Sequence, residues 1–192
     1  MLVISAPSGA GKLTLLNEVR QRAVDRFVTT ISATTRPPRQ GEADGREYYF
    51  LGRAEFEARR DAGAFVEWAE VHDNLYGTLH SELDRCLATG KDVILELDVQ
   101  GMKSLKRQRP DMVSVFLMPP SLDELERRLR KRGSESEEVI ALRVRNAAGE
   151  IAERGAFDYI VVNDKIETAA SDLEAIIRAE RCRAFRQLQE NA

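Results

Sequence analysis

The sequence predicts an α/β protein in which helices cover a mainly parallel sheet. Three observations lead to this fold class. Short apolar runs of strand length recur along the chain, and amphipathic stretches separate them. The chain has 192 residues, 43% of them hydrophobic and 32% charged. This composition supplies a core for one domain with insertions and argues against a disordered chain.

Four apolar runs are predicted as buried strands of this sheet, namely residues 2–5, 92–97, 112–118 and 159–162. Their nearly continuous apolar character is typical of parallel strands that are covered on both faces. A capping box at residues 121–124, after two prolines, predicts a helix start, and residues 134–137 repeat the pattern. Further apolar residues share one predicted C-terminal helical face: Ala169, Leu173, Ile176, Ile177, Ala184 and Leu188. We expect that face to cover the sheet.

The first predicted strand runs directly into a loop of small residues that ends in Gly11-Lys12, and a helical pattern follows. This is the context of a phosphate-binding loop, in which backbone N–H groups and the helix N-terminus surround a phosphate. A lysine at the end of the loop adds a positive charge for the β- and γ-phosphates. The alternative is a glycine-rich turn that merely joins strand to helix. The candidate ATP-binding residues here are Ala6, Pro7, Ser8, Gly9, Ala10, Gly11, Lys12, Leu13 and Thr14.

The loop departs from the usual pattern at two positions. Ala6 replaces the first glycine, which adds only a methyl group. Leu13 stands where a serine or threonine hydroxyl normally binds Mg²⁺, and an isobutyl group cannot bind a hard cation. Thr14 carries a hydroxyl, but one helical position further along it points elsewhere.

Residues 31–80 differ from the rest of the chain and are predicted to form an inserted, partly β subdomain. Arg36 and Arg39 flank two prolines, which rule out a regular helix or a central strand there. Two guanidinium groups at fixed spacing suit a phosphate with several oxygens. Tyr48 and Tyr76 are candidate donors to the same group. The alternative is a solvated, charged loop.

Three acidic residues are candidates for the base or the metal ion. Glu67 lies within a predicted strand, and a carboxylate aimed into a pocket can accept two N–H donors from guanine. Glu96 and Asp98 stand at the carboxyl end of another strand, where α/β sheets bind ligands. They are candidates to orient arginines or to hold water around Mg²⁺. The ordinary alternative is a surface residue for Glu67 and a simple strand exit for the other two.

The densest basic run covers residues 127–132 and is followed by Gly133, a possible hinge. Such runs are usually solvated helix faces, but arginines of a mobile flap can stabilise the charge of a phosphoryl group in transfer. We favour Arg128, Arg132 and Arg143 for this task.

Charge and composition exclude several classes of function. The net charge is −3, which disfavours a protein that binds nucleic acid through its phosphates. No apolar run is long enough to span a membrane, and no basic segment near Met1 indicates a secretion signal. Two cysteines and two histidines provide neither a disulfide framework nor a zinc site. We therefore expect reduced thiols and a cytoplasmic protein. The sequence leaves the oligomeric state open.

Several motifs, in this order, resemble those of the guanylate kinase family over residues 2 to about 180. They are the phosphate loop, Ser32-Ala-Thr-Thr-Arg-Pro-Pro-Arg39, Gly41-Glu-Ala-Asp-Gly45, Tyr48-Tyr-Phe50, Phe65-Val-Glu-Trp-Ala69, Tyr76-Gly-Thr78, Leu97-Asp-Val-Gln-Gly101, Arg128-Leu-Arg-Lys-Arg-Gly133 and Val162-Asn-Asp164. The resemblance implies a P-loop kinase that converts ATP and GMP to ADP and GDP with Mg²⁺. It also implies a parallel-sheet core flanked by helices (residues 1–30, 81–127 and 156–192), a GMP-binding subdomain (about 31–80) and a helical lid (about 128–155).

The resemblance also implies roles for individual residues. The implied GMP-binding residues are Ser32, Arg36, Arg39, Tyr48, Glu67, Tyr76, Thr78 and Asp98. The implied catalytic residues are Lys12, Arg36, Arg132 and Arg143, and Asn163 lies where the family approaches adenine. Mg²⁺ would be held by phosphates and water, with Glu96 or Asp98 as the candidate acids. We expect GMP and ATP as small-molecule substrates, with no nucleic acid and no membrane.

Leu13 leaves two alternatives to an ordinary kinase of this family. Guanylate-kinase-like domains of scaffold proteins bind phosphorylated peptides where the phosphate loop is lost, and Leu13 points in that direction. A P-loop kinase for another acceptor, such as a sugar phosphate, is the second alternative. The retained Lys12, Glu67 and arginine pair favour a slowed but real kinase of GMP.

Overall fold

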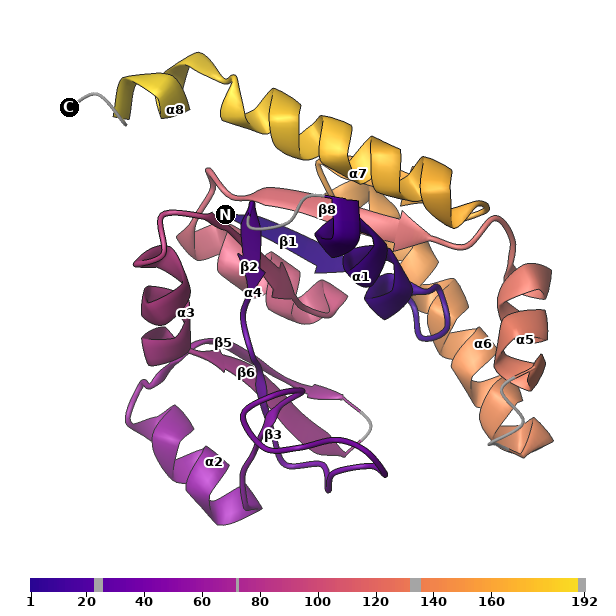
Figure 1. Ribbon diagram of the computed structural model, residues 1–192. Coiled ribbons are helices and arrows are strands. Elements are labelled where there is room, and N and C mark those ends of the chain that lie inside the picture. The colour runs from indigo at the N-terminus through magenta and orange to yellow at the C-terminus, as the bar shows by residue number, and fades with distance from the viewer. Residues whose placement is uncertain (23–25, 72, 132–135, 190–192) are drawn as a thin grey trace. The chain divides into compact units, whose positions relative to one another are not determined.

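The computed structural model describes residues 1–22, 26–71, 73–131 and 136–189 (Figure 1). Its contacts divide the chain into two compact units. The first unit comprises Met1–Ile4 and Asp25–Met112, and the second comprises Ser5–Val24 and Val113–Ala192. The three-part division into core, GMP-binding subdomain and lid remains a prediction.

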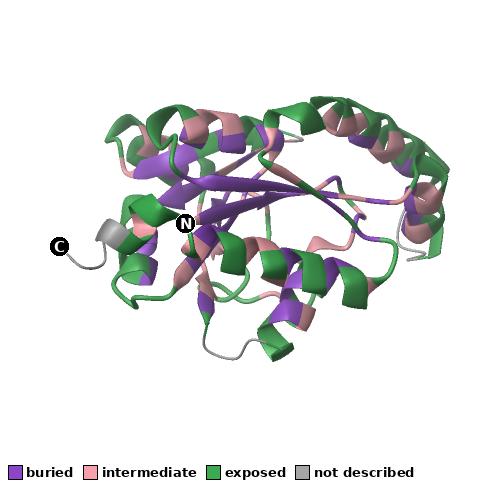
Figure 2. Ribbon diagram, turned by 90° about the horizontal axis from the view of Figure 1, so that it is seen from above, coloured by how far each residue is buried: buried purple, intermediate pink, exposed green. Residues whose placement is uncertain are grey.

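Three parallel strands form the first sheet of the first unit. β7 (Asp92–Glu96) lies in the middle and pairs with β1 (Leu2–Ser5) on one side and β2 (Phe27–Thr29) on the other. All four residues of β1 and the three central residues of β7 are buried. Figure 2 shows that the strands are buried, whereas the helices have exposed outer faces. Both faces of these strands are covered, which explains why their sequences are almost entirely apolar.

The second sheet of the first unit has four short strands in the order β4-β3-β6-β5, whose bounds are Tyr49–Phe50, Ala33–Thr34, Asn74–Leu79 and Phe65–Val71. β3 pairs in parallel with β4, and the other two pairs are antiparallel. The rings of Phe56 and Phe65 stack with their centroids 4.3 Å apart in a small core beneath this sheet. Phe56 comes from helix α2 (Arg53–Asp61). The sheet therefore has an apolar core of its own.

Two helices of the first unit lead into and away from β7. α3 (His80–Leu87) follows directly on β6, and α4 (Val99–Gln108) follows β7. Asp98 caps α4, because its side chain accepts a hydrogen bond from the Gly101 amide at 2.7 Å. α4 packs on β5. This brings the α4 N-terminus close to the second sheet.

The second unit combines two parallel strands with several helices. β8 (Val113–Met118) pairs with β9 (Tyr159–Val162). α1 packs against α7, and α5 packs against α6 around Leu125, Leu129 and Ile140. The bounds of the helices are α1 Lys12–Arg22, α5 Leu122–Lys131, α6 Glu137–Ala152, η1 Glu153–Ala156, α7 Ile166–Arg181 and α8 Ala184–Gln189.

The predicted α/β class, with parallel strands flanked by helices, is confirmed. All four predicted strands are present, although the runs 92–97 and 112–118 each extend one residue beyond the strand. Ser121 Oγ accepts the Glu124 amide at 3.1 Å at the start of α5, as a capping residue should. Ser134, of the second predicted capping box, lies outside the described residues, and Ser136 caps α6 instead.

The prediction of one continuous apolar face at the C-terminus was wrong in part. Ala169 and Leu173 are buried on α7, but that helix ends at Arg181 and α8 begins at Ala184, which is exposed. Residues 182–183 are not helical, so the helical spacing does not carry across them. Among the described residues, no helix is both long and apolar enough to cross a membrane.

Candidate functional site

The loop between β1 and α1 has the backbone of a phosphate-binding turn. Gly9 and Gly11 adopt φ angles of 94° and 91°, values that other residues adopt at a cost in energy. The Ala10 amide donates to the Pro7 carbonyl at 3.0 Å, which closes the turn. α1 then begins at Lys12, so its positive end follows the loop directly.

Asn163 supports this loop from within the second unit. Its side chain is 5% exposed, and Nδ2 donates to the Ala10 carbonyl at 2.7 Å. A Cβ placed on Gly11 would lie only 2.6 Å from that nitrogen. The structure therefore puts the Asn163 amide against the loop backbone, while its predicted proximity to adenine stays a prediction.

Arg143 of α6 also reaches the loop. Its Nη1 donates to Ser8 Oγ at 3.1 Å. A Cβ on Gly9 would lie 2.9 Å from Leu129 of α5, so residues of both α5 and α6 lie close to the loop. Arg132, the other predicted catalytic arginine of this region, lies outside the described residues.

The basic run at the end of α5 is largely engaged by acids. Glu124 accepts bonds from both Arg127 and Arg128, and these two guanidinium groups lower the pKa of Glu124 to about 2. Arg128 also donates to the backbone carbonyl of Asn163 at 3.0 Å. Arg130 pairs with Glu126 at 2.8 Å. These contacts favour a structural role for Arg128, which the sequence had suggested as a catalytic candidate.

Leu13 projects from the first turn of α1 and is 66% exposed, and Thr14 is exposed as well. Within the described part of the chain, no group of three or more His, Cys, Asp or Glu side chains could hold a metal ion. Asp98, one of the two candidate acids, already caps α4. The described residues therefore do not form a metal centre by themselves.

In the first unit, Glu42 organises the predicted phosphate arginines. Its carboxylate lies 3.0 Å from Arg36 Nη2 and accepts the Arg39 backbone amide at 2.7 Å. Burial alone would lower the pKa of Arg36, but the Glu42 carboxylate outweighs it and raises that pKa. Arg36 also donates to the Pro37 carbonyl at 2.7 Å. Glu42 had no predicted role, because nothing in the sequence spacing links it to Arg36.

The two tyrosines predicted to bind phosphate lie together beside Arg36. The rings of Tyr48 and Tyr76 meet edge to face at 6.0 Å, and the Arg36 guanidinium lies 5.3 Å from the Tyr48 ring centre. Burial raises the pKa of Tyr48, and the negative charge of Glu96 adds to this effect. The phenol is therefore held neutral, as a hydrogen-bond donor. Ser32 directly precedes β3 and is half-buried. Its backbone carbonyl accepts a hydrogen bond from the Tyr49 amide at 2.9 Å.

Glu67 is the most unusual side chain of the first unit. It is 5% exposed on β5, opposite Thr78 of β6. Among the described residues, Glu67 Oε1 and Thr78 Oγ1 both lack a hydrogen-bond partner. Burial raises the pKa of Glu67 to about 7; Thr78 opposes the rise and the charge of Asp98 adds to it. Buried polar atoms without partners are costly, and a ligand that satisfies them recovers that cost.

Gly101 makes room for this carboxylate. A Cβ at Gly101 would lie 2.7 Å from Glu67 Oε2 and 3.1 Å from Asp98 Oδ1. Glu67 and Asp98 thus meet at the N-terminus of α4, together with Thr78. The motif containing Gly101 was visible in the sequence, but the reason for its glycine was not, since it depends on packing between α4 and β5.

Comparison with known proteins decides the family. The guanylate kinase family model matches residues 1–180. The chain belongs to the guanylate kinase family. It is accordingly a nucleoside monophosphate kinase.

Individual members of the guanylate kinase family match nearly the whole chain. The guanylate kinase of Aromatoleum aromaticum is 48% identical, and the match covers 95% of this chain and 89% of that protein. The guanylate kinase of Geobacter metallireducens is 47% identical, and the match covers 98% of this chain and 93% of that protein. The crystal structure of guanylate kinase from Anaplasma phagocytophilum has a TM-score of 0.79 at 34% identity, covering 97% of this chain and 88% of that one.

Proposed function

We propose that this protein transfers the γ-phosphoryl group of ATP to GMP, with ADP and GDP as products. The observation that carries the choice of acceptor is the buried, unpartnered pair of Glu67 Oε1 and Thr78 Oγ1. The similarity to guanylate kinases of other organisms supports the same reaction. The product would place the protein in purine nucleotide metabolism, and the two free cysteines agree with a cytoplasmic location.

Guanine matches the Glu67 pocket in chemistry. Its N1–H and exocyclic amine are adjacent donors, and an ionised carboxylate can accept both. Adenine has an acceptor at N1 and no amine at C2, so it would leave the carboxylate of Glu67 without donors. Since leaving a buried polar group unpaired costs more than losing an exposed contact, the pocket discriminates between the two bases. Ser32, Thr78 and Asp98 are proposed to assist.

The phosphate of GMP is proposed to bind Arg36, Arg39, Tyr48 and Tyr76. Arg36 is well prepared for this, because Glu42 and the Tyr48 ring restrict its guanidinium before any ligand arrives. A fixed guanidinium fork offers parallel N–H donors to two phosphate oxygens. Restricting it in advance reduces the entropy lost on binding.

On the donor side, the backbone of residues 6–11, together with Leu13 and Thr14 of the first turn of α1, is proposed to surround the phosphates of ATP. Pro7 contributes to the shape of this loop but has no N–H to donate. Lys12 would neutralise the β- and γ-phosphates, while Arg143, already bonded to Ser8 of the loop, would carry positive charge to the group in transfer. Arg132 is proposed for the same task and Asn163 for proximity to adenine.

The reaction balances as a simple displacement. A phosphate oxygen of GMP forms a bond to the γ-phosphorus, and the bond from that phosphorus to the β–γ bridging oxygen breaks, which leaves ADP. No covalent intermediate with the protein is required. The proposed work of the residues is to position both nucleotides, stabilise charge and exclude water.

Magnesium is proposed to arrive as part of the ATP complex, held by phosphate oxygens and water. Leu13 offers it no oxygen, and no acidic cluster within the described residues replaces that ligand. Metal charge stabilisation is worth several kcal/mol in phosphoryl transfer, so losing part of it should slow turnover roughly 10- to 100-fold. Glu96 and Asp98 remain the candidate acids for its water shell.

Leu13 also supports a second candidate function, a phosphopeptide-binding module without useful turnover. The arginine and tyrosine cluster would then bind the phosphate of a peptide. This alternative keeps the acceptor side and gives no role to Lys12 or to the contact of Arg143 with the loop. A kinase uses both sides, and for that reason we favour it.

The test is ADP production from MgATP with GMP, with AMP as the control acceptor, for the wild type, Leu13→Ser and Leu13→Ala. We expect turnover with GMP only, an increase of about 10-fold or more for Leu13→Ser, and no such increase for Leu13→Ala, which removes the same bulk without adding a hydroxyl. Binding of GMP without turnover in any of the three proteins would overturn the kinase and favour the binding module. Turnover with both acceptors would overturn the base selectivity.

A further inference from the structure

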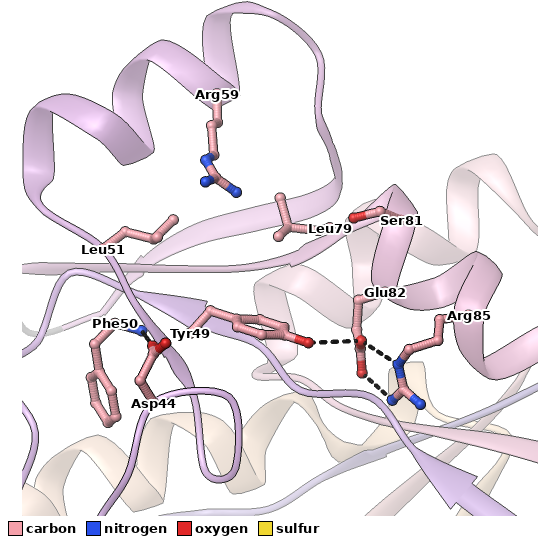
Figure 3. A pocket seen from close by; sticks show the side chains of 9 residues that line it. All are labelled: Asp44, Tyr49, Phe50, Leu51, Arg59, Leu79, Ser81, Glu82 and Arg85. Atoms are coloured by element: carbon pink, nitrogen blue, oxygen red, sulfur yellow. Dashed lines mark hydrogen bonds and ion pairs between the residues drawn. The ribbon is translucent and has the colours of Figure 1, made fainter.

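A second buried carboxylate of the first unit, Glu82 of α3, has no part in the proposed reaction. Its side chain is 2% exposed and lies at the wall of a cavity of about 450 Å³ (Figure 3). Unlike Glu67, it is fully engaged. A buried carboxylate that binds several partners is expected to fix those partners relative to one another.

Glu82 binds two other segments of the chain and Arg85 of its own helix. Oε1 accepts the Ile31 backbone amide at 2.8 Å and Arg85 Nη2 at 2.8 Å. Oε2 accepts the Tyr49 hydroxyl at 3.2 Å and Arg85 Nε at 2.8 Å. Figure 3 shows Tyr49 and Arg85 approaching the carboxylate from opposite sides. The bidentate bond from Arg85 balances the charge, so the carboxylate can stay ionised when buried.

One of these partners, Ile31, lies where the chain passes from the first sheet to the second. The Thr30 amide still bonds to Ile94 of β7 at 3.1 Å, and Ile31 is the next residue. Ser32 follows, and β3 begins one residue later. α3 itself is the segment that returns from the second sheet toward the first. Glu82 therefore joins the outgoing and returning connections of the two sheets.

Two of these partners, Ile31 and Tyr49, are sequence neighbours of residues proposed to contact GMP. Ile31 precedes Ser32, and Tyr49 follows Tyr48. The two segments are tied to each other as well, because the Tyr49 amide donates to the Ser32 carbonyl at 2.9 Å. A shift of Ile31 or Tyr49 would thus move Ser32 and Tyr48 together.

We propose that Glu82 is a positioning residue for the acceptor nucleotide, acting through the Ile31 amide and the Tyr49 hydroxyl on Ser32 and Tyr48. This inference rests on the proposed function, since it concerns the binding of GMP. The physical reason is pre-organisation: charge-assisted bonds to a buried carboxylate hold the two segments in the bound arrangement before the ligand arrives. Without them, binding GMP has to order those segments at its own cost.

The test compares Glu82→Gln and Tyr49→Phe with Glu57→Gln. Glutamine keeps the size of Glu82 but loses the charge that binds Arg85 and Tyr49, and Tyr49→Phe removes a single bond from the same network. Glu57 is the matched control, because it pairs with Arg53 in the same unit at an exposed position. Amide hydrogen exchange of the substrate-free proteins, measured by NMR, reports the segments without any nucleotide. Equilibrium affinities for GMP and ATP, with kcat at saturating GMP, report the consequence.

For Glu82→Gln we expect at least 10-fold faster exchange at Ile31, about 10-fold weaker GMP binding, unchanged ATP affinity, and kcat within about twofold of wild type. Tyr49→Phe should show a smaller change of the same kind, and Glu57→Gln none. A purely structural role would instead weaken both nucleotides together and speed exchange across the whole unit, which would overturn the proposal. Wild-type GMP affinity in Glu82→Gln would overturn it as well.

Failure of the proposed function and failure of the Glu82 proposal give different results in the wild-type protein. If wild type binds no GMP, the reaction is wrong and Glu82 has no acceptor to position, whatever exchange at Ile31 shows. If wild type phosphorylates GMP and only the Glu82→Gln effect is missing, the reaction stands and this inference alone falls.

Discussion

The buried pair of Glu67 and Thr78 in the first unit and the loop around Ala10 in the second are built in opposite ways. In the pair, Glu67 Oε1 and Thr78 Oγ1 are buried without a partner among the described residues. In the loop, the Ala10 carbonyl is bonded to Asn163 and the Ser8 hydroxyl to Arg143. The first region leaves buried polar atoms unpaired, whereas the second uses its polar atoms in hydrogen bonds that fix the shape of the loop.

The difference fits the two tasks proposed for these regions. A pocket that must choose between bases gains selectivity from buried groups that only the correct ligand satisfies. A loop that binds the phosphates common to many nucleotides needs a fixed backbone more than a reserve of unpaired groups. Several changes would break or sharpen this comparison, and the first has the largest expected effect.

Gly11→Ala should damage the loop most. Its φ of 91° is unfavourable for alanine, and the new Cβ would lie 2.6 Å from Asn163 Nδ2. We expect kcat/KM for ATP to fall on the order of 10²–10³-fold, because the donor amides move, while the affinity for GMP is kept. Steady-state kinetics and GMP titration would measure both. Gly149→Ala is the matched control, since nothing lies within 4 Å of its Cβ; equal losses in the two variants would contradict a special role for the loop.

Glu67→Gln should damage the pocket. A glutamine offers one acceptor and one donor where the carboxylate offers two acceptors, so guanine is no longer matched. We expect kcat/KM for GMP to fall about 10²-fold and the preference for GMP over AMP to shrink, with KM for ATP unchanged. Glu70→Gln, an exposed change on the same strand, serves as the control. Retained selectivity in Glu67→Gln would show that other residues read the base.

The pH dependence of GMP binding should report the Glu67 pKa of about 7, which burial sets. Only the ionised carboxylate accepts both donors of guanine, so KM for GMP should fall about 10-fold between pH 6 and pH 8. The phosphate of GMP titrates near the same range, and Glu67→Gln at each pH separates the two effects. A pH profile identical in wild type and variant would exclude Glu67 as the group responsible.

The same pKa predicts how stability depends on pH. The folded value is above the usual 4.5, so the native protein binds the proton more tightly than the unfolded chain does. The contribution of Glu67 is therefore fully present below pH 4.5 and is lost as the pH rises through 7. Integrated over that range it amounts to roughly 3 kcal/mol at most. Urea unfolding at pH 5 and pH 8 should show a smaller decrease for Glu67→Gln than for wild type.

Arg127→Ala should have the smallest effect. Its side chain is 68% exposed and its guanidinium pairs with Glu124 at the surface of α5. Exposed pairs contribute little to stability, so we expect neither the melting temperature nor kcat to change measurably. Arg143→Ala, in contrast, should lower kcat about 10-fold because that side chain contacts the loop. A large loss of activity in Arg127→Ala would instead indicate that the basic run at residues 127–132 takes part in catalysis.

Contiguous features were determined by the sequence alone. The strand, loop and helix of residues 2–22 are local, and each is written in neighbouring residues: an apolar run, small residues at positive φ, then a helical pattern. The apolar runs identified all four predicted parallel strands for the same reason. The local pattern around Glu67 also predicted its strand, and the two prolines beside Arg36 predicted an irregular segment, as the structure shows.

Only the tertiary structure decided how distant residues act on one another. Asn163 reaches Ala10 across 153 positions of sequence, and Gly101 makes room for Glu67 because α4 packs on β5. The pairing of Glu42 with Arg36 and the bonds of Glu82 follow from loop and helix geometry that no periodicity encodes. Burial and hydrogen bonding are properties of the packed chain, and so the charge state and partners of a side chain cannot be read from its neighbours in sequence.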